Sequence, residues 1–428
     1  MDDAGDPRTQ APEARPGRDV TAWHWAVLAI STLAASATSA FVVGVAFLIP
    51  HLHAAGVSLT AAGVLVAMPN VGVACALVAW GSLVDAKGER LALTAGAALS
   101  ALAIGASIWI AAAGGTGTAD LVWLGVLFTL GGATSAAANS ASGRVVVGWF
   151  PPRRRGLAMG IRQMSQPAGV AVAAMTMPWL AGEYGLSAAL GVPMAFAAAS
   201  AVLSALVVKD PPRPDKSSSS AALLGTSPYR VPYLWRIHGT SVLLVLPQTL
   251  MQSWLLVWLV VGEGWNAVAA GTVVTVTQVL GGIGRIVVGG ASDRIPHRNW
   301  LLRWVAMSAA VAFGALTVAE AVGVPNSVAI AVAVIASVIA VADNGLAFTS
   351  VAEFAGPFWS GRALGVQNTM QFLAVSAATP LFAAVISGHG FVWAFALATL
   401  AGIAAIPLVP RRDEFRDEPV ESLGADRK

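Results

Sequence analysis

The stretch GSLVDAKGER, residues 81–90, is a short charged segment between two long apolar runs. It contains four charged residues, Asp85, Lys87, Glu89 and Arg90. The flanking runs, 59–82 and 91–113, are each long enough to cross the hydrocarbon core of a membrane, which needs about 20 apolar residues. The charged stretch is therefore interpreted as the connection between two membrane-spanning helices.

Composition extends this interpretation to the whole chain of 428 residues. Hydrophobic residues make up 56% and charged residues 11%, and the mean hydropathy is +0.71. A soluble protein of this length needs far more polar surface. Twelve apolar windows predict an all-α integral membrane protein with twelve transmembrane helices. They lie at 23–50, 59–82, 91–113, 120–147, 156–181, 187–208, 238–262, 266–291, 300–322, 327–354, 361–386 and 391–409.

The basic residues predict the orientation in the membrane. All 25 Lys and Arg lie in the two tails, in the connections after even-numbered spans, or at the adjoining helix ends. The connections on the opposite side contain none. Under the positive-inside rule both termini are cytoplasmic, in a multi-pass protein of the cell (inner or plasma) membrane. The formal charge of +3 follows from this topology and gives no reason to expect nucleic-acid binding.

Composition also divides the chain into five segments. Residues 1–22 and 411–428 are polar and are expected to be cytoplasmic tails, the first of them disordered. The one long internal loop, 209–237, contains KDPPRPDKSSSS and is typical of a flexible cytoplasmic linker. It separates two predicted bundles, 23–208 and 238–410, of six spans each.

The two halves show an internal repeat. RGLAMGIRQMSQ at 155–166 aligns with SGRALGVQNTMQ at 360–371, and this offset of 205 pairs Gly156 with Gly361, Gln166 with Gln371 and Asn139 with Asn344. The opening stretch aligns with GGASDRIPHR at 289–298, and this offset of 208 pairs Gly81 with Gly289, Asp85 with Asp293 and Arg90 with Arg298. Such a duplication predicts two pseudo-symmetric six-helix bundles.

This organisation resembles the major facilitator superfamily. The resemblance rests on the six-plus-six repeat, the long central loop, the G-x-x-x-D-x-x-G-x-R pattern after the second span and the segment WFPPRRRGLAMG before the fifth. It covers residues 20–410 or so. The resemblance implies a secondary active transporter that works by alternating access, in which two bundles expose a central site to one side of the membrane at a time.

The resemblance also implies a role for the charged connections. Asp85 would bind the start of the eleventh span near Gly361, and by the repeat Asp293 would face the start of the fifth near Gly156, because helix N-termini offer free N–H groups. These contacts would hold the cytoplasmic side shut. The residues assigned to this latch are Gly81, Asp85, Gly88, Arg90, Gly289, Asp293 and Arg298. The alternative is that the charges only fix the topology and solubilise the loops.

Large polar side chains within the spans predict a central path. Away from their ends, spans 3, 6, 9 and 12 carry only small hydroxyls. Polar groups at lipid depth usually face a cavity, and every third helix is peripheral in the superfamily arrangement. The candidate substrate or cavity residues are Asn139, Arg162, Gln166, Gln248, Gln278, Arg285, Asn344 and Gln371.

Asp343 is the only carboxylate expected near the middle of the membrane. It lies ten residues before Glu353, which places it about 15 Å from the cytoplasmic end at ~1.5 Å per residue. Removal from water disfavours the charged form of a carboxyl group, which suits a group that binds and releases a proton. Asp343 is therefore the predicted proton-coupling site. Two alternatives remain open: a structural ion pair with Arg285 or Arg162, and direct contact with substrate.

Arg285 indicates the substrate class. An arginine eight residues before the second motif Asp is similar to the arrangement in oxalate:formate and monocarboxylate transporters, which implies a small, monocarboxylate-like organic anion. Nitrate porters of the superfamily carry a second arginine in span 2, where the repeat places Leu77. The alternatives are a proton-driven efflux antiporter for drugs or metabolites and a transport-inactive membrane sensor.

Patterns typical of enzymes do not occur in the sequence. It contains no H-E-x-x-H, no phosphate-binding Gly loop with its Lys and no C-x-x-C, and Cys75 is its single cysteine. We therefore expect no enzymatic activity, no metal site and no cofactor. The expected partners are a small-molecule substrate, the proton as coupling ion and the lipid bilayer, and the chain is expected to function as a monomer.

Overall fold

The computed structural model describes residues 20–114, 117–210, 227–294 and 298–410, and every regular element in these ranges is helical. The first half contains α1 (Ala22–Val42), η1 (Gly44–Leu48), α2 (Ile49–Ala54), α3 (Leu59–Lys87), α4 (Glu89–Ala112), α5 (Thr118–Trp149), α6 (Pro152–Gln163), α7 (Ser165–Tyr184) and α8 (Leu186–Val207). The second half contains η4 (Pro228–Arg230), α9 (Pro232–Val257), η5 (Trp258–Gly262), α10 (Ala267–Arg294), α11 (Arg298–Val322), α12 (Asn326–Ile339), α13 (Asp343–His389) and α14 (Phe391–Ala405).

These helices account for the twelve expected spans. Among the described residues, ten helical stretches are long and apolar enough to cross a membrane. The helix α7 and the shorter apolar helix α14 correspond to the remaining two spans. The all-α membrane fold that the sequence predicts is confirmed.

Two spans differ from the simple helices that the sequence predicts. The fifth consists of α6 and α7, which are separated at Met164. The tenth consists of α12 and the start of α13, with residues 340–342 between them outside any helix. Beyond that break, α13 continues through the expected connection between spans 10 and 11 as one helix of 47 residues.

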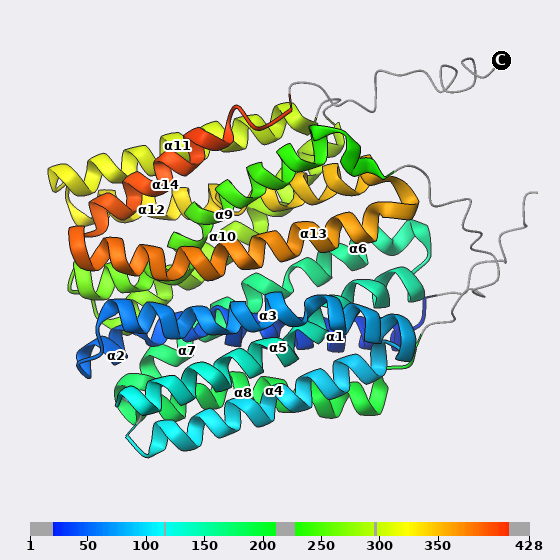
Figure 1. The fold of residues 1–428 in the computed structure, drawn as a ribbon, viewed down its shortest axis with the longest axis horizontal. Coiled ribbons are helices and arrows are strands. Elements are labelled where there is room, and N and C mark those ends of the chain that lie inside the picture. Colours follow the sequence, from blue (N-terminus) through cyan, green and yellow to red (C-terminus); the bar gives the residue numbers. More distant parts are fainter. Residues whose placement is uncertain (1–19, 115–116, 211–226, 295–297, 411–428) are drawn as a thin grey trace, which may run out of the picture.

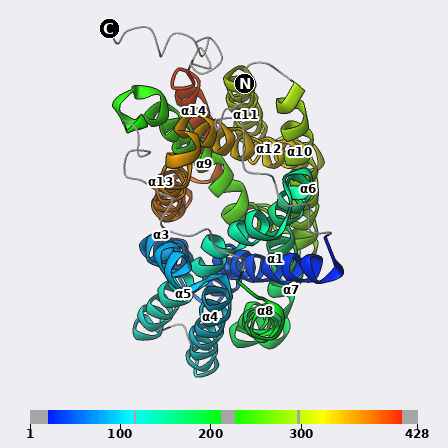
Figure 2. The same ribbon diagram turned by 90° about the vertical axis from the view of Figure 1, so that its right-hand side faces the viewer.

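The helices form two groups, which lie one above the other in Figure 1. We call α1–α8 the N-terminal bundle and α9–α14 the C-terminal bundle. Within the first, α4 packs on α5 and α8, and within the second, α9 packs on α13. The bundles meet along two helix pairs, α3 with α13 and α7 with α10. Figure 2 shows both pairs at the boundary between the bundles.

The internal repeat is visible in the backbone. Gly185 precedes α8 with φ of 86°, and Gly390 precedes α14 with φ of 87°. The two positions differ by 205, the offset found in the sequence. This left-handed conformation is accessible to glycine at little cost, so each half makes the same sharp turn between its last two spans.

The outer helices α4, α8, α11 and α14 expose large apolar side chains. Leu102 of α4 is 69% exposed, Leu206 of α8 is 76%, Val311 of α11 is 72% and Leu400 of α14 is 61%. So much exposed apolar surface is unusual for a soluble protein. In a bilayer it faces lipid, which agrees with the expected peripheral position of every third span.

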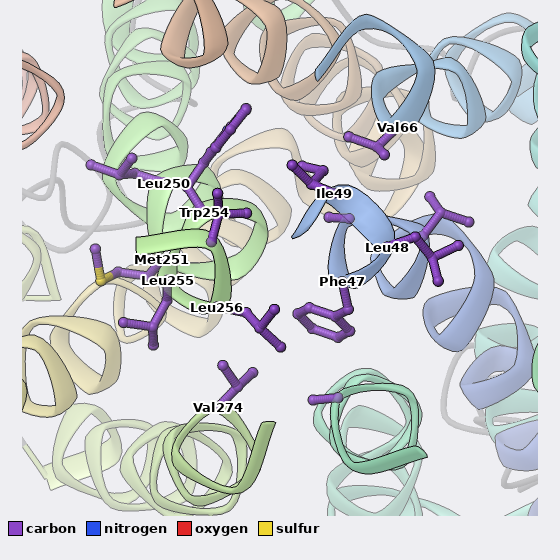
Figure 3. Packing of buried hydrophobic residues seen from close by; sticks show 14 of the residues in the cluster. Phe47, Leu48, Ile49, Val66, Leu250, Met251, Trp254, Leu255, Leu256 and Val274 are labelled. Atoms are coloured by element: carbon purple, nitrogen blue, oxygen red, sulfur yellow. The ribbon is translucent and has the colours of Figure 1, made fainter. Parts of the chain in front are cut away.

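The two bundles share a hydrophobic core at one end of the molecule. We call the end where α8 and α9 flank the linker the linker end, and the opposite end the far end (Figure 1). At the far end, Phe47 and Ile49 of the N-terminal bundle belong to one buried cluster with Trp254 and Leu256 of α9. Figure 3 shows these side chains on facing helices. The far end is therefore closed by apolar packing between the bundles.

Two glycines allow the helices to approach closely in this closed region. A Cβ atom at Gly63 of α3 would lie 2.4 Å from Cβ of Ala383, and one at Gly271 of α10 would lie 2.2 Å from the carbonyl oxygen of Ala174. Gly63 and Gly271 differ by 208, so they are equivalent in the repeat. Thr275 Oγ1 also donates to the Ala171 carbonyl oxygen across the α7–α10 contact, at 3.2 Å.

At the linker end, the buried clusters are confined to single bundles. One contains Leu234, Leu302 and Val351 and lies wholly within the C-terminal bundle. Another includes Val27 and Leu93 and lies wholly within the N-terminal bundle. Among the described residues, the large apolar core that joins the bundles is thus at the far end.

Candidate substrate site

A small pocket lies next to Arg285, between the two ends of the molecule. Pro167 of α7 comes from the N-terminal bundle, and the other lining residues come from α9, α10 and the α12 region. They are Gln248, Met251, Gln252, Thr277, Gln278, Gly281, Gly282, Arg285, Ser337, Ala340 and Val341. The pocket is therefore a feature of the C-terminal bundle that the N-terminal bundle covers.

Arg285 connects the two bundles at this pocket. Its Nη1 donates to Oε1 of Gln166 on α7, at 3.1 Å. Its Nε is buried and has no hydrogen-bond partner. The neighbouring glycines let α10 approach its neighbours, since a Cβ at Gly282 would lie 2.9 Å from Cε of Met164. Arg285 is thus a half-buried cation whose side-chain partner is a neutral amide.

Two further expected residues meet at the pocket wall. Asn344 Nδ2 donates to Oε1 of Gln248, at 3.0 Å. Gln252 lies one helical turn beyond Gln248 and also lines the pocket, and its buried Nε2 has no hydrogen-bond partner. Unpaired buried donors are costly unless a ligand or water satisfies them. This side of the pocket therefore favours a ligand rich in hydrogen-bond acceptors.

Asp343 lies at the break in the tenth span. It is the first residue of α13 and only 1% exposed. Its carboxylate lies near the backbone N–H groups of Asp343 and Asn344, at the positive end of the helix. The field of Arg285 also reaches it, but Asp343 forms no ion pair within 4.0 Å among the described residues. Its Oδ2 is buried without a hydrogen-bond partner.

Arg162 and Asn139 form a second polar group in the N-terminal bundle. Arg162 donates to Ser142 Oγ at 3.0 Å, to Gln163 Oε1 at 2.9 Å and to the Asn139 carbonyl oxygen at 3.5 Å. These partners are neutral, so Arg162 resembles Arg285 in this respect. Gln166 lies one helical turn from Arg162 across the break at Met164, which places the two polar groups next to each other.

The remaining expected cavity residues have different positions. Gln278 lines the pocket. Gln371 lies on α13 and is not among the pocket-lining residues, and its buried Nε2 has no hydrogen-bond partner. The structure thus brings Gln166, Gln248, Gln278, Arg285 and Asn344 together, next to Asp343.

The expected latch is described only in part. Arg90 donates from its backbone N to Asp210 Oδ1 at 2.8 Å and from Nη2 to the Ala205 carbonyl oxygen at 2.7 Å. Gly88 has φ of 105°, and a Cβ there would lie 2.5 Å from the Asp210 carboxylate. Arg298 pairs with Glu353 at 3.1 Å, and the space around Gly81 is open. The side chains of Asp85 and Asp293 and positions Gly156, Gly289 and Gly361 lie outside the described residues, so the latch stays a prediction.

Sequence reasoning missed a buried polar group at the linker end. His238 is 0% exposed, and its Nδ1 hydrogen-bonds Oε1 of Gln367 on α13. Its Nε2 lies 3.1 Å from the hydroxyl of Tyr229, and Gln367 Nε2 donates to Ser241 Oγ. The sequence feature that could have indicated this group is His238 itself, a histidine at the start of an apolar span. The group holds the end of the linker against α9 and α13.

Sequence comparison identifies the family. The model of the Major Facilitator Superfamily matches residues 28–379. The chain belongs to the major facilitator superfamily. It is similar to the "Uncharacterized MFS-type transporter Rv2994" of Mycobacterium tuberculosis (strain ATCC 25618 / H37Rv), with 43% identity over 391 residues, which are 91% of this chain and 85% of that protein. It is 27% identical over 259 residues to the "Probable nitrate/nitrite transporter NarK2" of the same strain, covering 59% of this chain and 62% of that protein.

Solved structures of superfamily members have the same fold. The D-xylose-proton symporter superposes with a TM-score of 0.74 at 14% identity, covering 91% of this chain and 98% of that chain. The inward open conformation of the xylose transporter XylE from E. coli superposes with a TM-score of 0.70 at 15% identity, covering 91% and 98%. As a superfamily member, the chain is a multi-pass membrane transporter of small molecules that works by alternating access, and it is not an enzyme.

Proposed function

We propose that this superfamily member carries a small organic anion and that Arg285 binds its negative charge. The observation that carries the proposal is a half-buried guanidinium at the pocket, bonded to a neutral amide and with its buried Nε unpaired. A carboxylate satisfies a guanidinium with two parallel, charge-assisted hydrogen bonds. The unpaired amide of Gln252 in the pocket wall adds a further donor.

The comparison with NarK2 supports an anion as the substrate class, since that protein is named a probable nitrate/nitrite transporter. Leu77 stands at the repeat position of Arg285, so the N-terminal bundle offers no equivalent cation there. A single arginine suits a monocarboxylate of a few carbon atoms. Nitrate is therefore one of the ligands that the test must include.

Transport is coupled to the proton through Asp343 in this proposal. Its carboxylate is buried within the electrostatic field of Arg285, and the break between α12 and α13 places it there. When Asp343 is ionised, its charge competes with a substrate anion for the favourable potential around Arg285. When it is protonated, that competition ends, so a proton and an anion bind together more readily than either binds alone.

The orientation predicted from the basic residues places the linker end in the cytoplasm. The closed far end would then face outward, and the molecule would be in an inward-open state. An anion would enter or leave the pocket from the cytoplasmic side in this state.

The proposal is tested by ligand binding and counterflow in proteoliposomes. Acetate, lactate, pyruvate, oxalate and nitrate are screened for thermal stabilisation of the purified protein, which binding produces by mass action. Arg285→Gln is expected to abolish the stabilisation and the counterflow of the best anion, while Arg154→Gln, in an exposed arginine, is expected to preserve both.

Three outcomes contradict the proposal in different ways. Binding that is unchanged in Arg285→Gln removes Arg285 as the anion partner. Stabilisation by apolar drugs and by none of the anions favours the efflux antiporter. Tight anion binding without counterflow indicates a sensor.

A further inference from the structure

We propose that Gln166 occupies the substrate's place in the empty carrier, so that an anion must displace Gln166 from Arg285 in order to bind. This inference rests on the proposed function, because it assumes that Arg285 is the anion partner. It adds a role for Gln166: its amide oxygen stands in for one substrate oxygen, and it links substrate binding to the contact between the bundles.

The hydrogen bond in question crosses the bundle boundary. Gln166 lies in the first turn of α7, and Arg285 lies in α10, which packs against α7. Nη1 of Arg285 and Oε1 of Gln166 are 3.1 Å apart. The next residue, Pro167, lines the pocket together with Arg285. The amide oxygen is therefore at the pocket edge, on the guanidinium that an anion would use.

The chemistry of the contact makes it replaceable. The amide oxygen is neutral and accepts from a single guanidinium nitrogen, while Arg285 Nε is left buried and unpaired. A carboxylate brings a full negative charge and two oxygens, so it can engage two nitrogens of the fork at once. A guanidinium–carboxylate pair adds the attraction of opposite charges and a second parallel hydrogen bond, and the neutral amide supplies neither. An anion can therefore displace the amide, but its binding includes the cost of breaking the hydrogen bond between Gln166 and Arg285.

The repeat supplies an internal comparison. Gln371 is equivalent to Gln166 by the offset of 205, and Leu77 is equivalent to Arg285 by the offset of 208. Leu77 has no donor to offer, and the side-chain nitrogen of Gln371 is buried without a hydrogen-bond partner. The same glutamine position thus occurs in both halves, and the bond across the bundles is formed where the other half supplies an arginine.

Displacement of Gln166 would weaken the contact between α7 and α10. Near this bond, Met164 at the break before α7 and Pro167 of α7 lie beside Gly282 of α10, since a Cβ there would be 2.9 Å from Met164 Cε and 3.6 Å from Pro167 Cγ. Loss of the polar contact leaves apolar packing between α7 and α10 at the centre of the molecule, and such packing permits sliding more easily than a directional hydrogen bond. Substrate binding would thereby allow the two bundles to move relative to each other. In the empty carrier, the hydrogen bond between Gln166 and Arg285 would keep them in place.

The test compares two substitutions with opposite expected signs. Gln166→Ala removes the competing acceptor, so the dissociation constant of the best-binding carboxylate from acetate, lactate, pyruvate and oxalate should fall about fivefold. In proteoliposomes its KM should fall and its kcat should fall too, because release becomes slower. Gln166→Glu places a carboxylate against Arg285 and should weaken binding more than about tenfold.

The matched control removes an amide outside the path. Asn266 accepts a hydrogen bond from the backbone of Val268 at the start of α10, and Asn266→Ala should leave the dissociation constant unchanged. A folding defect lowers binding in both Gln166 variants and cannot tighten it in one. Tighter binding in Gln166→Ala with weaker binding in Gln166→Glu therefore supports the inference.

Two results overturn it, and they are distinguishable from failure of the proposed function. Weaker or equal binding in Gln166→Ala, with binding abolished in Arg285→Gln, shows that Gln166 contacts the substrate directly or not at all while Arg285 remains the anion partner. Unchanged binding in Arg285→Gln removes the anion site itself, and the role of Gln166 is then rejected together with it.

Discussion

Asp343 shows how a single residue obtains its properties from the helix that it begins. Depth counting from the sequence predicted a carboxylate in the middle of the membrane, and the structure finds it 1% exposed. The break that places it at the start of α13 was not predicted, because IAVADNG contains no proline and its glycine follows the break. The carboxylate lies near the N–H groups that the break exposes, those of Asp343 and Asn344.

The prediction at this residue concerns the pH dependence of transport in Asp343→Asn. The amide keeps the size of the carboxyl group, but it cannot bind or release a proton. Anion uptake driven by a pH gradient should disappear, and anion exchange at equal pH should persist at a rate within a few-fold of wild type. Radiolabelled uptake at several external pH values measures both. Retained acceleration at low external pH would show that the proton binds elsewhere.

A second residue prediction concerns stability. His238→Ala leaves the Gln367 amide oxygen and the Tyr229 hydroxyl without their buried partner. Such a loss costs about 1–3 kcal/mol, so the thermal unfolding midpoint should fall. His389→Ala, in an exposed histidine at the far end, is the control and should leave the midpoint unchanged. An unaltered midpoint in His238→Ala would mean that this polar group contributes no net stability.

At the scale of elements, the contacts α3–α13 and α7–α10 determine which end of the molecule is closed. Hydropathy located these helices well, since spans follow from apolar length alone. It could not show that α6 and α7 separate at Met164, or that Gly63 and Gly271 mark close crossings between the bundles. Those features depend on which helices pack against each other, and this cannot be derived from a single sequence.

The crossing at Gly271 leads to a prediction about the far end. A side chain in Gly271→Val would collide with the Ala174 backbone, because a Cβ there lies 2.2 Å from its carbonyl oxygen. The far end should then fail to close. In a Cys75→Ser background, a cysteine at Leu256, which is 0% exposed, should react with an aqueous thiol reagent at least about tenfold faster.

The control for this experiment is Gly182→Val, because a Cβ at Gly182 meets no atom within 4 Å. It should leave the labelling rate at Leu256→Cys as slow as in the parent. Equal, slow labelling in Gly271→Val would mean that α7 and α10 adjust without opening the far end.

At the scale of the whole molecule, the duplication sets the architecture and the site breaks its symmetry. The offsets of 205 and 208 predicted two bundles, and the turns at Gly185 and Gly390 repeat them in the backbone. The asymmetry was visible in the sequence as Arg285 against Leu77. The closed end was not predictable, because one sequence must stabilise both end states of a carrier to within a few kcal/mol.

The most direct test of the central claim, that the bundles open at one end as they close at the other, is pulsed electron–electron distance measurement. Spin-label pairs at Ala55 and Ser387 report the far end, and pairs at Leu157 and Arg362 report the linker end, in a Cys75→Ser background. We expect a short far-end distance in the empty protein. Addition of a transported anion at low pH should populate a longer far-end distance and a shorter linker-end distance in equal proportion. Distances that stay fixed at both ends, or that lengthen together, while the anion is being exchanged would contradict it.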